Sequence, residues 1–377
     1  MNIKSLLLGS AAALTAVSGA QAADAVVAAE PEPVEYVRVC DAYGAGYFYI
    51  PGTETCLRIS GYVRFDVGGG DNLGAVNIDR QDGDLNDTWN IRTRFTLRTH
   101  TASETELGTL RTFTETRFQY DTNAKTRTEY VLLPDGSIDT VDVFDGTQAE
   151  FESPTINFAY IELGGLRLGK DETAFRTFLG YAGNVINDDT LESEGYDTNL
   201  ISYTFTAGNG FSAVVSLEQG GDDYTIDSYT PHVVAGLKYA QGWGSVGIVG
   251  GYDANYEEWA VKARADINVN DAFSFFVMGA WRSDGEVENR GNNFYASWGG
   301  DWIGWVGASY KFNDKATANL QVSYDEAEEL AVAANVAYQL VPGFTITPEL
   351  LYTKNSEDFA GNDDDYWGGM VRFQRSF

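Results

Sequence analysis

Arginine side chains recur at alternating positions near the start of the chain, and acidic side chains crowd a later segment. Arg92, Arg94 and Arg98 share one parity within 89–101, whereas 171–197 carries seven carboxylates and a single arginine. Residues of one parity lie on the same face of a β-strand. Fixed charges of this kind attract, repel and orient dissolved ions. The first chemistry that these residues suggest is therefore electrostatic selection of solutes.

Catalysis has few candidate residues, because His100 and His232 are the only histidines. Hydrolases of the lipase or protease type need a histidine or a close pair of carboxylic acids. We expect His100 near one end of the second predicted strand and His232 at the opposite end of the eighth, so that they share no site. The sequence therefore predicts no enzyme, no cofactor and no metal site.

The first 22 residues are typical of a secretory signal peptide. They combine a short basic start, an apolar stretch and a small-residue cleavage site at Ala20-Gln21-Ala22. The apolar stretch is too short to cross a bilayer, which disfavours the alternative of a membrane anchor. We predict cleavage after Ala22 and an exported protein.

Cys40 and Cys56 are the two cysteines of the chain. In an oxidising compartment a local disulfide is the favoured use of such a pair. We predict that it closes the aromatic-rich loop 41–55 into a clasp at the periplasmic end, within an N-terminal segment 23–57. The formal charge of −30 argues against nucleic acid as a partner, because phosphate backbones require basic residues.

Alternation of apolar and polar residues recurs along most of the chain. Within 58–67, Ile59 and Val63 share one face, and Arg64 lies on the other. A period of two residues indicates a β-strand. The pattern predicts sixteen strands, at 58–67, 89–101, 106–120, 151–163, 165–170, 198–206, 210–219, 231–240, 244–253, 257–269, 272–283, 302–312, 315–324, 329–341, 343–354 and 366–377. Pro348 should remove a ladder hydrogen bond from the fifteenth strand, with a bulge as one way to accommodate it.

The connections between these strands alternate between short turns and long loops, which is the plan of an up-and-down barrel in an outer membrane. The charged face would be costly to bury dry, but it can line water inside a wide tube while the apolar face meets lipid. Closure requires the last strand, which ends at Phe377, to pair with the first, because an open edge in lipid leaves backbone groups without partners. We therefore predict an all-β protein, a sixteen-stranded antiparallel transmembrane barrel over 58–377. A secreted, soluble all-β binding protein is the alternative.

Four stretches together resemble the alphaproteobacterial porins, especially those of the rhizobial and Brucella-like group. They are RISGYVRFDVGGG at 58–70, ELGGLRLGKDETAF at 162–175, FYASWGGDW followed by GASYKFNDKATANLQVSYD within 294–325, and VRFQRSF at 371–377. The resemblance implies homotrimers in the outer membrane that let small hydrophilic solutes diffuse passively. It also implies that Phe377 is the signal recognised by the barrel-assembly machinery.

The resemblance further implies that the third long loop, 171–197, folds inward and narrows the tube. Its acidic residues are then the expected constriction residues: Asp171, Glu172, Asp188, Asp189, Glu192 and Glu194. Lumen parity in the first three strands and the last predicts a basic arc on the facing wall: Arg58, Arg64, Arg92, Arg94, Arg98, Arg111, Arg117 and Arg372. We hypothesise a transverse field between loop and arc. A solvated surface loop, and local pairing of the arginines with Asp66 and Glu115, are the alternatives.

The outer loops carry most of the acidic excess, so a weak preference for cations is expected. A channel dedicated to a sugar or an anion is the alternative function, although neither an aromatic slide nor a lysine cluster is evident in the sequence. The loop carboxylates could also hold divalent cations beside lipopolysaccharide phosphates.

Overall fold

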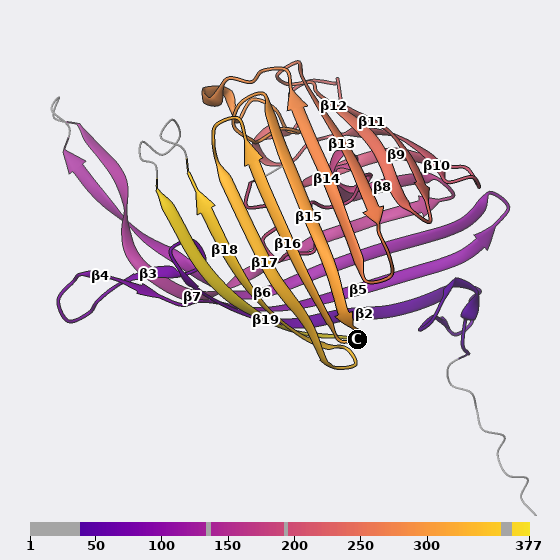
Figure 1. Cartoon of the computed structure of the whole chain (residues 1–377), viewed down its shortest axis with the longest axis horizontal. Coiled ribbons are helices and arrows are strands. Elements are labelled where there is room, and N and C mark those ends of the chain that lie inside the picture. Colours follow the sequence, from indigo (N-terminus) through magenta and orange to yellow (C-terminus); the bar gives the residue numbers. More distant parts are fainter. Residues whose placement is uncertain (1–37, 133–136, 192–194, 356–363) are drawn as a thin grey trace, which may run out of the picture. The chain divides into compact units, whose positions relative to one another are not determined.

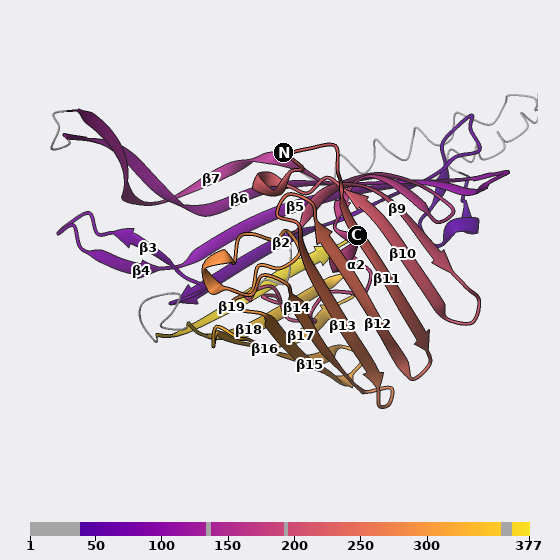
Figure 2. The same cartoon turned by 90° about the horizontal axis from the view of Figure 1, so that it is seen from above.

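The computed structural model describes residues 38–132, 137–191, 195–355 and 364–377. The predicted signal peptide, 1–22, lies outside the described residues, as do 23–37 of the N-terminal segment. From Val39 onward the chain is dominated by one antiparallel sheet that closes on itself (Figures 1 and 2). The expected sixteen-stranded barrel is confirmed.

The wall strands follow one another in chain order around the barrel. They are β2 (Cys56–Gly70), β5 (Asn90–Thr105), β6 (Gly108–Leu132), β7 (Ile138–Leu163), β8 (Leu166–Glu172), β9 (Asp197–Thr206), β10 (Phe211–Glu218), β11 (His232–Gln241), β12 (Gly244–Asp253), β13 (Glu258–Asn268), β14 (Phe273–Arg282), β15 (Trp302–Asn313), β16 (Ala316–Asp325), β17 (Leu330–Val341), β18 (Phe344–Lys354) and β19 (Asp365–Ser376). Each expected strand has a counterpart among them.

Closure occurs between the last strand and the first, as expected. Arg372 of β19 lies opposite Asp66 of β2, and the two strands stay in register from Gly368 to Ser376. Phe377 extends the seam, because its backbone N–H donates to the Gly61 carbonyl at 3.0 Å and its own carbonyl accepts from the Gly61 N–H at 3.1 Å. Phe377 thus continues the backbone pairing between β19 and β2.

The outer surface of the barrel is apolar, as the alternation predicts. Ile59 and Phe65 of β2 are 51% and 40% exposed, whereas Tyr62 and Asp66 of the same strand, on the lumen face, are 5% exposed each. Aromatic residues near strand ends are exposed too, for example Trp259. A soluble fold would bury such a face against a second layer.

Two segments expected to be loops contain regular strands. Segment 121–150 continues β6 and β7 beyond the other strands, and their paired residues run as far as Leu132 and Ile138 (Figures 1 and 2). Segment 68–88 contains the hairpin β3 (Ala75–Ile78) and β4 (Leu85–Thr88). This hairpin contacts the extension, because Asn77 Oδ1 accepts from the Thr147 N–H at 3.1 Å.

Pro348 causes no bulge. It lies opposite Val371 of β19, and on its other side the register of β18 with β17 is the same at Asn335 and at Tyr338. The paired ladder is interrupted between those two positions, and its one register shift lies further along β17, between Gln339 and Val341. The missing backbone N–H of Pro348 is therefore accommodated without a shift of register around it.

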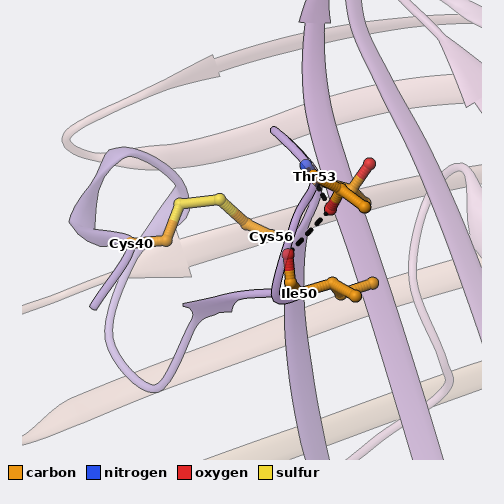
Figure 3. Close-up of a disulfide and its surroundings, with 5 residues drawn as sticks. Cys40, Ile50, Thr53 and Cys56 are labelled. Atoms are coloured by element: carbon orange, nitrogen blue, oxygen red, sulfur yellow. Dashed lines mark hydrogen bonds between the residues drawn. A yellow bond between two sulfur atoms is a disulfide. The ribbon is translucent and has the colours of Figure 1, made fainter. Parts of the chain in front are cut away.

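The N-terminal segment is clasped by the predicted disulfide between Cys40 and Cys56, whose Cα atoms are 6.1 Å apart (Figure 3). Between the two cysteines lie the 3₁₀ turn η1 (Asp41–Tyr43) and the short strand β1 (Phe48–Tyr49), which pairs with β2. The Thr53 hydroxyl closes the turn before Cys56 by donating to the Ile50 carbonyl at 3.0 Å. Both cysteines are buried.

Candidate pore constriction

The third long loop folds into the barrel, as predicted. It leaves β8 at Thr173, whose side chain caps the short helix α2 (Ala174–Thr177) by accepting from the Phe175 N–H at 3.1 Å. Phe175 and Leu179 are 0% and 3% exposed, which is unusual for loop residues. The wall makes room for the loop: a Cβ atom on Gly236 of β11 would lie 2.8 Å from the Phe178 ring, so a larger residue there would force the ring to shift.

The middle of this loop is tied to the far wall of the barrel by polar side chains. Glu349 of β18 accepts from the Ile186 N–H at 2.5 Å, the Asn187 N–H at 2.9 Å and the Asn187 Nδ2 at 2.6 Å. Asn335 of β17 donates to the Asn184 carbonyl at 3.1 Å. The loop therefore crosses from β8 to β18 and divides the interior.

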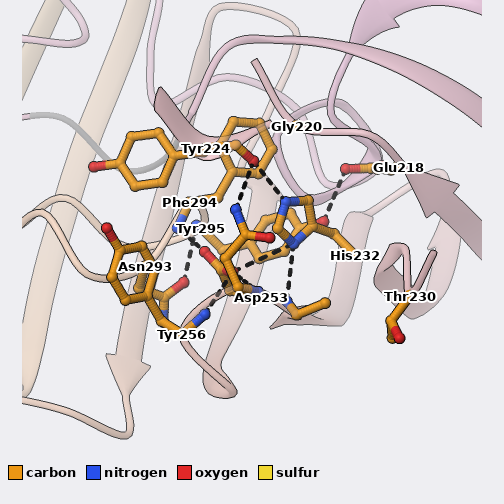
Figure 4. Close-up of polar contacts among 12 residues, drawn as sticks. Glu218, Gly220, Tyr224, Thr230, His232, Asp253, Tyr256, Asn293, Phe294 and Tyr295 are labelled. Atoms are coloured by element: carbon orange, nitrogen blue, oxygen red, sulfur yellow. Dashed lines mark hydrogen bonds and ion pairs between the residues drawn. The ribbon is translucent and has the colours of Figure 1, made fainter. Parts of the chain in front are cut away.

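A second loop also folds inward, which the sequence analysis did not anticipate. Segment 284–301 was expected as a long outer loop, but Phe294 and Tyr295 are 2% and 0% exposed. The Tyr295 hydroxyl donates to Glu218 of β10 at 3.0 Å (Figure 4). The same carboxylate accepts from Thr173 Oγ1 at 2.6 Å. One buried glutamate thus joins this loop to the start of the third loop. The apolar run FYASW in an otherwise polar segment was the available signal.

His232 belongs to this second anchoring cluster. Its Nδ1 accepts from the Ala254 N–H at 2.9 Å and its Nε2 lies 2.8 Å from the Tyr224 carbonyl, so Nε2 carries the proton and the ring is neutral (Figure 4). Asp253 accepts from the Phe294 N–H at 2.7 Å. His232 stacks on the Phe294 ring, with centroids 5.6 Å apart. The histidine has a packing role here.

The wall opposite the third loop carries rows of side chains that lie side by side across strands. One row contains Arg372, Asp66, Arg92 and Asp121. Arg372 Nε lies 2.8 Å from the Asp66 carboxylate, and Arg92 Nε lies 2.6 Å from that of Asp121. Within this row the charges alternate and cancel.

A second group of wall arginines shares one carboxylate. Glu115 is fully buried, 2.5 Å from Arg98 Nε and 2.9 Å from Arg117 Nε. Asn157 of β7 donates to the same carboxylate at 3.0 Å. The local pairing with Asp66 and Glu115 considered from the sequence is therefore present.

A cavity of about 610 Å³ separates the third loop from this wall. Its wall side includes six arginines of the predicted arc: Arg64, Arg92, Arg94, Arg98, Arg117 and Arg372. Its loop side includes three of the predicted acids, Glu172, Asp188 and Asp189. Side chains of both signs thus face one space.

The remaining predicted residues lie elsewhere. Arg58 contacts the His100 ring, with Nη2 at 3.2 Å from Nε2, and Arg111 lies opposite Ala102. Asp171 belongs to β8, where it accepts from Arg167 Nη1 at 2.6 Å. Two of the predicted loop acids, Glu192 and Glu194, lie outside the described residues.

Burial changes the titration of the loop residues. It raises the pKa of Asp188 to about 7, with the Asp189 carboxylate adding to the shift and Arg176 opposing it. Burial and the nearby Glu172 raise the pKa of Tyr196 to about 12. The charge on the loop therefore depends on pH near neutrality, which the sequence analysis did not predict.

The described residues contain no group of three or more histidine, cysteine, aspartate or glutamate side chains that could hold a metal ion. In the same part of the chain no helix combines the length and the apolar character needed to cross a membrane.

A closed barrel with an apolar exterior, a polar interior and an inward loop defines the class of outer-membrane channels. Residues 24–370 match the family described as the Porin subfamily, and the chain belongs to that family. The protein is an integral β-barrel of the outer membrane and a porin channel.

Two relatives align with this chain over its full length and over their own full length. Porin Omp2a of Brucella melitensis biotype 1 is 56% identical over 384 residues, and Porin Omp2b of Brucella suis is 54% identical over 403 residues. A mutant of Rh. blastica porin has a similar solved structure, with a TM-score of 0.57 at 16% identity, over 85% of this chain and 100% of that chain. The outer membrane channel DcaP of Acinetobacter baumannii has a TM-score of 0.56 at 14% identity, over 87% and 99%. These structures support the fold.

Proposed function

We propose that this porin is a passive, water-filled diffusion channel for small hydrophilic solutes and ions, with weak ion selectivity and no catalytic activity. The observation that carries the proposal is the cavity between the third loop and the arginine wall, where Asp188 and Arg94 line the same space. A tube of sixteen strands encloses an aqueous channel rather than a filled core. The inward loop is then what narrows it.

Selectivity is proposed to be weak because no single pair of charges dominates. Two unlike charges separated by ~8 Å in water interact by about half a kcal/mol. Salt screens such interactions further. We propose a slight preference for cations, since the acidic excess of the chain enriches cations at the mouth.

Planar-bilayer recording and liposome swelling test this proposal. Purified protein should give stepwise currents that increase linearly with salt, and swelling rates should fall smoothly with the size of a neutral sugar. Swelling that saturates with one sugar, or is blocked by it, would favour the alternative of a solute-specific channel. Absence of any conductance from correctly assembled barrels would refute the channel itself.

We propose a homotrimer embedded in outer-membrane lipid and lipopolysaccharide as the assembled form. The wide apolar outer wall, with residues such as Phe65 exposed, supports contact with lipid and with other copies. Cross-linking in native membranes followed by electrophoresis should give a three-chain species. Trimers whose stability is unchanged by a chelator would count against a role of divalent cations between loop carboxylates and lipopolysaccharide.

We also propose the domain layout of signal peptide 1–22, periplasmic segment 23–57 and barrel 58–377, with assembly by the barrel-assembly machinery through Phe377. Its support is the seam geometry, where Phe377 pairs with Gly61. Mass spectrometry of the mature chain tests the cleavage after Ala22. Deletion of Phe377 should lower the fraction of heat-modifiable barrel in the outer membrane, and unchanged assembly would refute the role.

A further inference from the structure

One row of wall side chains in the cavity carries charge that its own members do not neutralise. Arg64 of β2 lies opposite Arg94 of β5, and Gln374 of β19 and Gln119 of β6 flank them. The neighbouring row also has two arginines, Arg372 and Arg92, but its other two members are aspartates, Asp66 and Asp121. It is therefore neutral, whereas the Arg64 row has a net charge of two.

The two arginines of this row are held by neutral partners. Arg64 Nε donates to Gln374 Oε1 at 2.9 Å, and Arg94 Nε donates to Gln119 Oε1 at 2.6 Å. Among the described residues, neither arginine takes part in an ion pair. The nearest acid along the row is Glu152, which lies beyond Gln119 and accepts from its Nε2 at 2.9 Å.

Packing on an aromatic ring fixes the position of Arg64, and the hydrogen bond to Gln119 fixes that of Arg94. The buried Tyr62 ring lies beneath the Arg64 guanidinium, which is 4.6 Å from the ring centroid, and Arg98 lies 5.5 Å from the same centroid. Cation–π contacts of this kind orient a guanidinium without reducing its charge. Both Arg64 and Arg94 are half-buried and line the cavity. A preorganised pair of guanidiniums is thus presented to the space that solutes would cross.

The geometry points to an oxyanion subsite at Arg64 and Arg94, which binds solutes that carry a phosphate or carboxylate group transiently. Planar guanidiniums match the geometry of such groups and bond to them in a bidentate manner. Glutamines leave the positive charge available, which aspartates in the same places would cancel. The inference deepens the proposed function and rests on it, because it assumes that the cavity lies on the permeation path.

Inorganic phosphate is the probe, added to planar bilayers at constant ionic strength and neutral pH. We expect the wild-type current to fall as phosphate replaces chloride. In Arg64→Gln or Arg94→Gln, the phosphate concentration that gives half of the decrease in current should rise about tenfold. This is the loss of affinity expected for one charge-assisted contact. Gln374→Glu keeps both arginines and should cause a similar loss, because a carboxylate would then neutralise Arg64. Arg127→Gln on the exposed extension of β6 is the control of equal charge change and should leave the effect unchanged.

The outcomes separate this subsite from the proposed function. Conductance without any phosphate effect overturns the subsite and leaves the channel intact, whereas no conductance refutes the channel. A loss in Arg92→Gln as large as in Arg64→Gln would also overturn the assignment, since it would show that the whole wall acts and not this row. Retained phosphate sensitivity in Gln374→Glu would contradict the charge argument.

Discussion

Replacing Glu349 by alanine is expected to release the middle of the third loop from the barrel wall. Three donors of the loop, on Ile186 and Asn187, converge on this buried carboxylate. The three donors are half-buried, and a hydrogen bond to a charged group contributes about 1.5–3 kcal/mol, so the loss for the three is roughly 3 kcal/mol or more. This corresponds to a decrease of more than about a hundredfold in the ratio of barrels with the third loop attached to barrels with it released. The contact of Asn335 with the Asn184 carbonyl remains, but as a single hydrogen bond it contributes only about 0.5–1.5 kcal/mol.

Single-channel recording is the assay. The released loop should give a larger and noisier conductance, because the cavity it bounds widens and fluctuates. Glu349→Gln keeps an oxygen acceptor and should show a smaller change. Thr347→Ala, on the same face of β18 two residues earlier, is the matched control and should behave as wild type. If Glu349→Ala has the conductance and noise of wild type, then the carboxylate does not hold the loop and the reasoning fails.

Three further predictions concern charge, pH and the N-terminal clasp. Replacing Arg92, Arg94 and Arg98 together by serine should raise cation preference, and unchanged reversal potentials in a salt gradient would reject the basic arc. Asp188 is charged above a pH of about 7 and neutral below it, so acidification should shift the reversal potential towards anions. Asp188→Asn should abolish that shift, and its persistence would assign it to another group. Reducing the Cys40–Cys56 bond should destabilise the clasp by about 3 kcal/mol in the chain-entropy model. Faster proteolysis within 41–55 after reduction would show this effect, and equal cleavage rates before and after reduction would contradict it.

Much of the wall could be predicted because the signal is local. Side chains alternate across a strand whatever the strand pairs with, so the parity of Arg64 or Ile59 follows from the neighbouring residues alone. The closing of the barrel follows from the same pattern, since an exposed edge in lipid is not tolerated. The disulfide needed only two cysteines and an oxidising compartment.

The loops were less predictable, because their partners are distant in the chain. Ile186 is held by Glu349, which is 163 residues away in the chain. The sequence around either residue does not indicate that the other is its partner. The inward course of 284–301 likewise depends on Glu218 and Asp253 on other strands. The extension of β6 and β7 in place of a loop reflects pairing between two polar segments whose alternation is weak.

Local alternation was enough to assign the class of protein, the lipid-facing and water-facing sides, and the set of arginines from which the wall is built. It could not assign height along the barrel, so Arg58 and Arg111 were grouped with the cavity arginines although neither of them lines the cavity. The register between strands decides how high along the barrel each arginine lies and which row it joins. It also decides whether the side chain that pairs with the arginine is neutral or acidic. Register is a property of the closed sheet, and it is what makes the pair at Arg64 and Arg94 differ from the neutral row beside it.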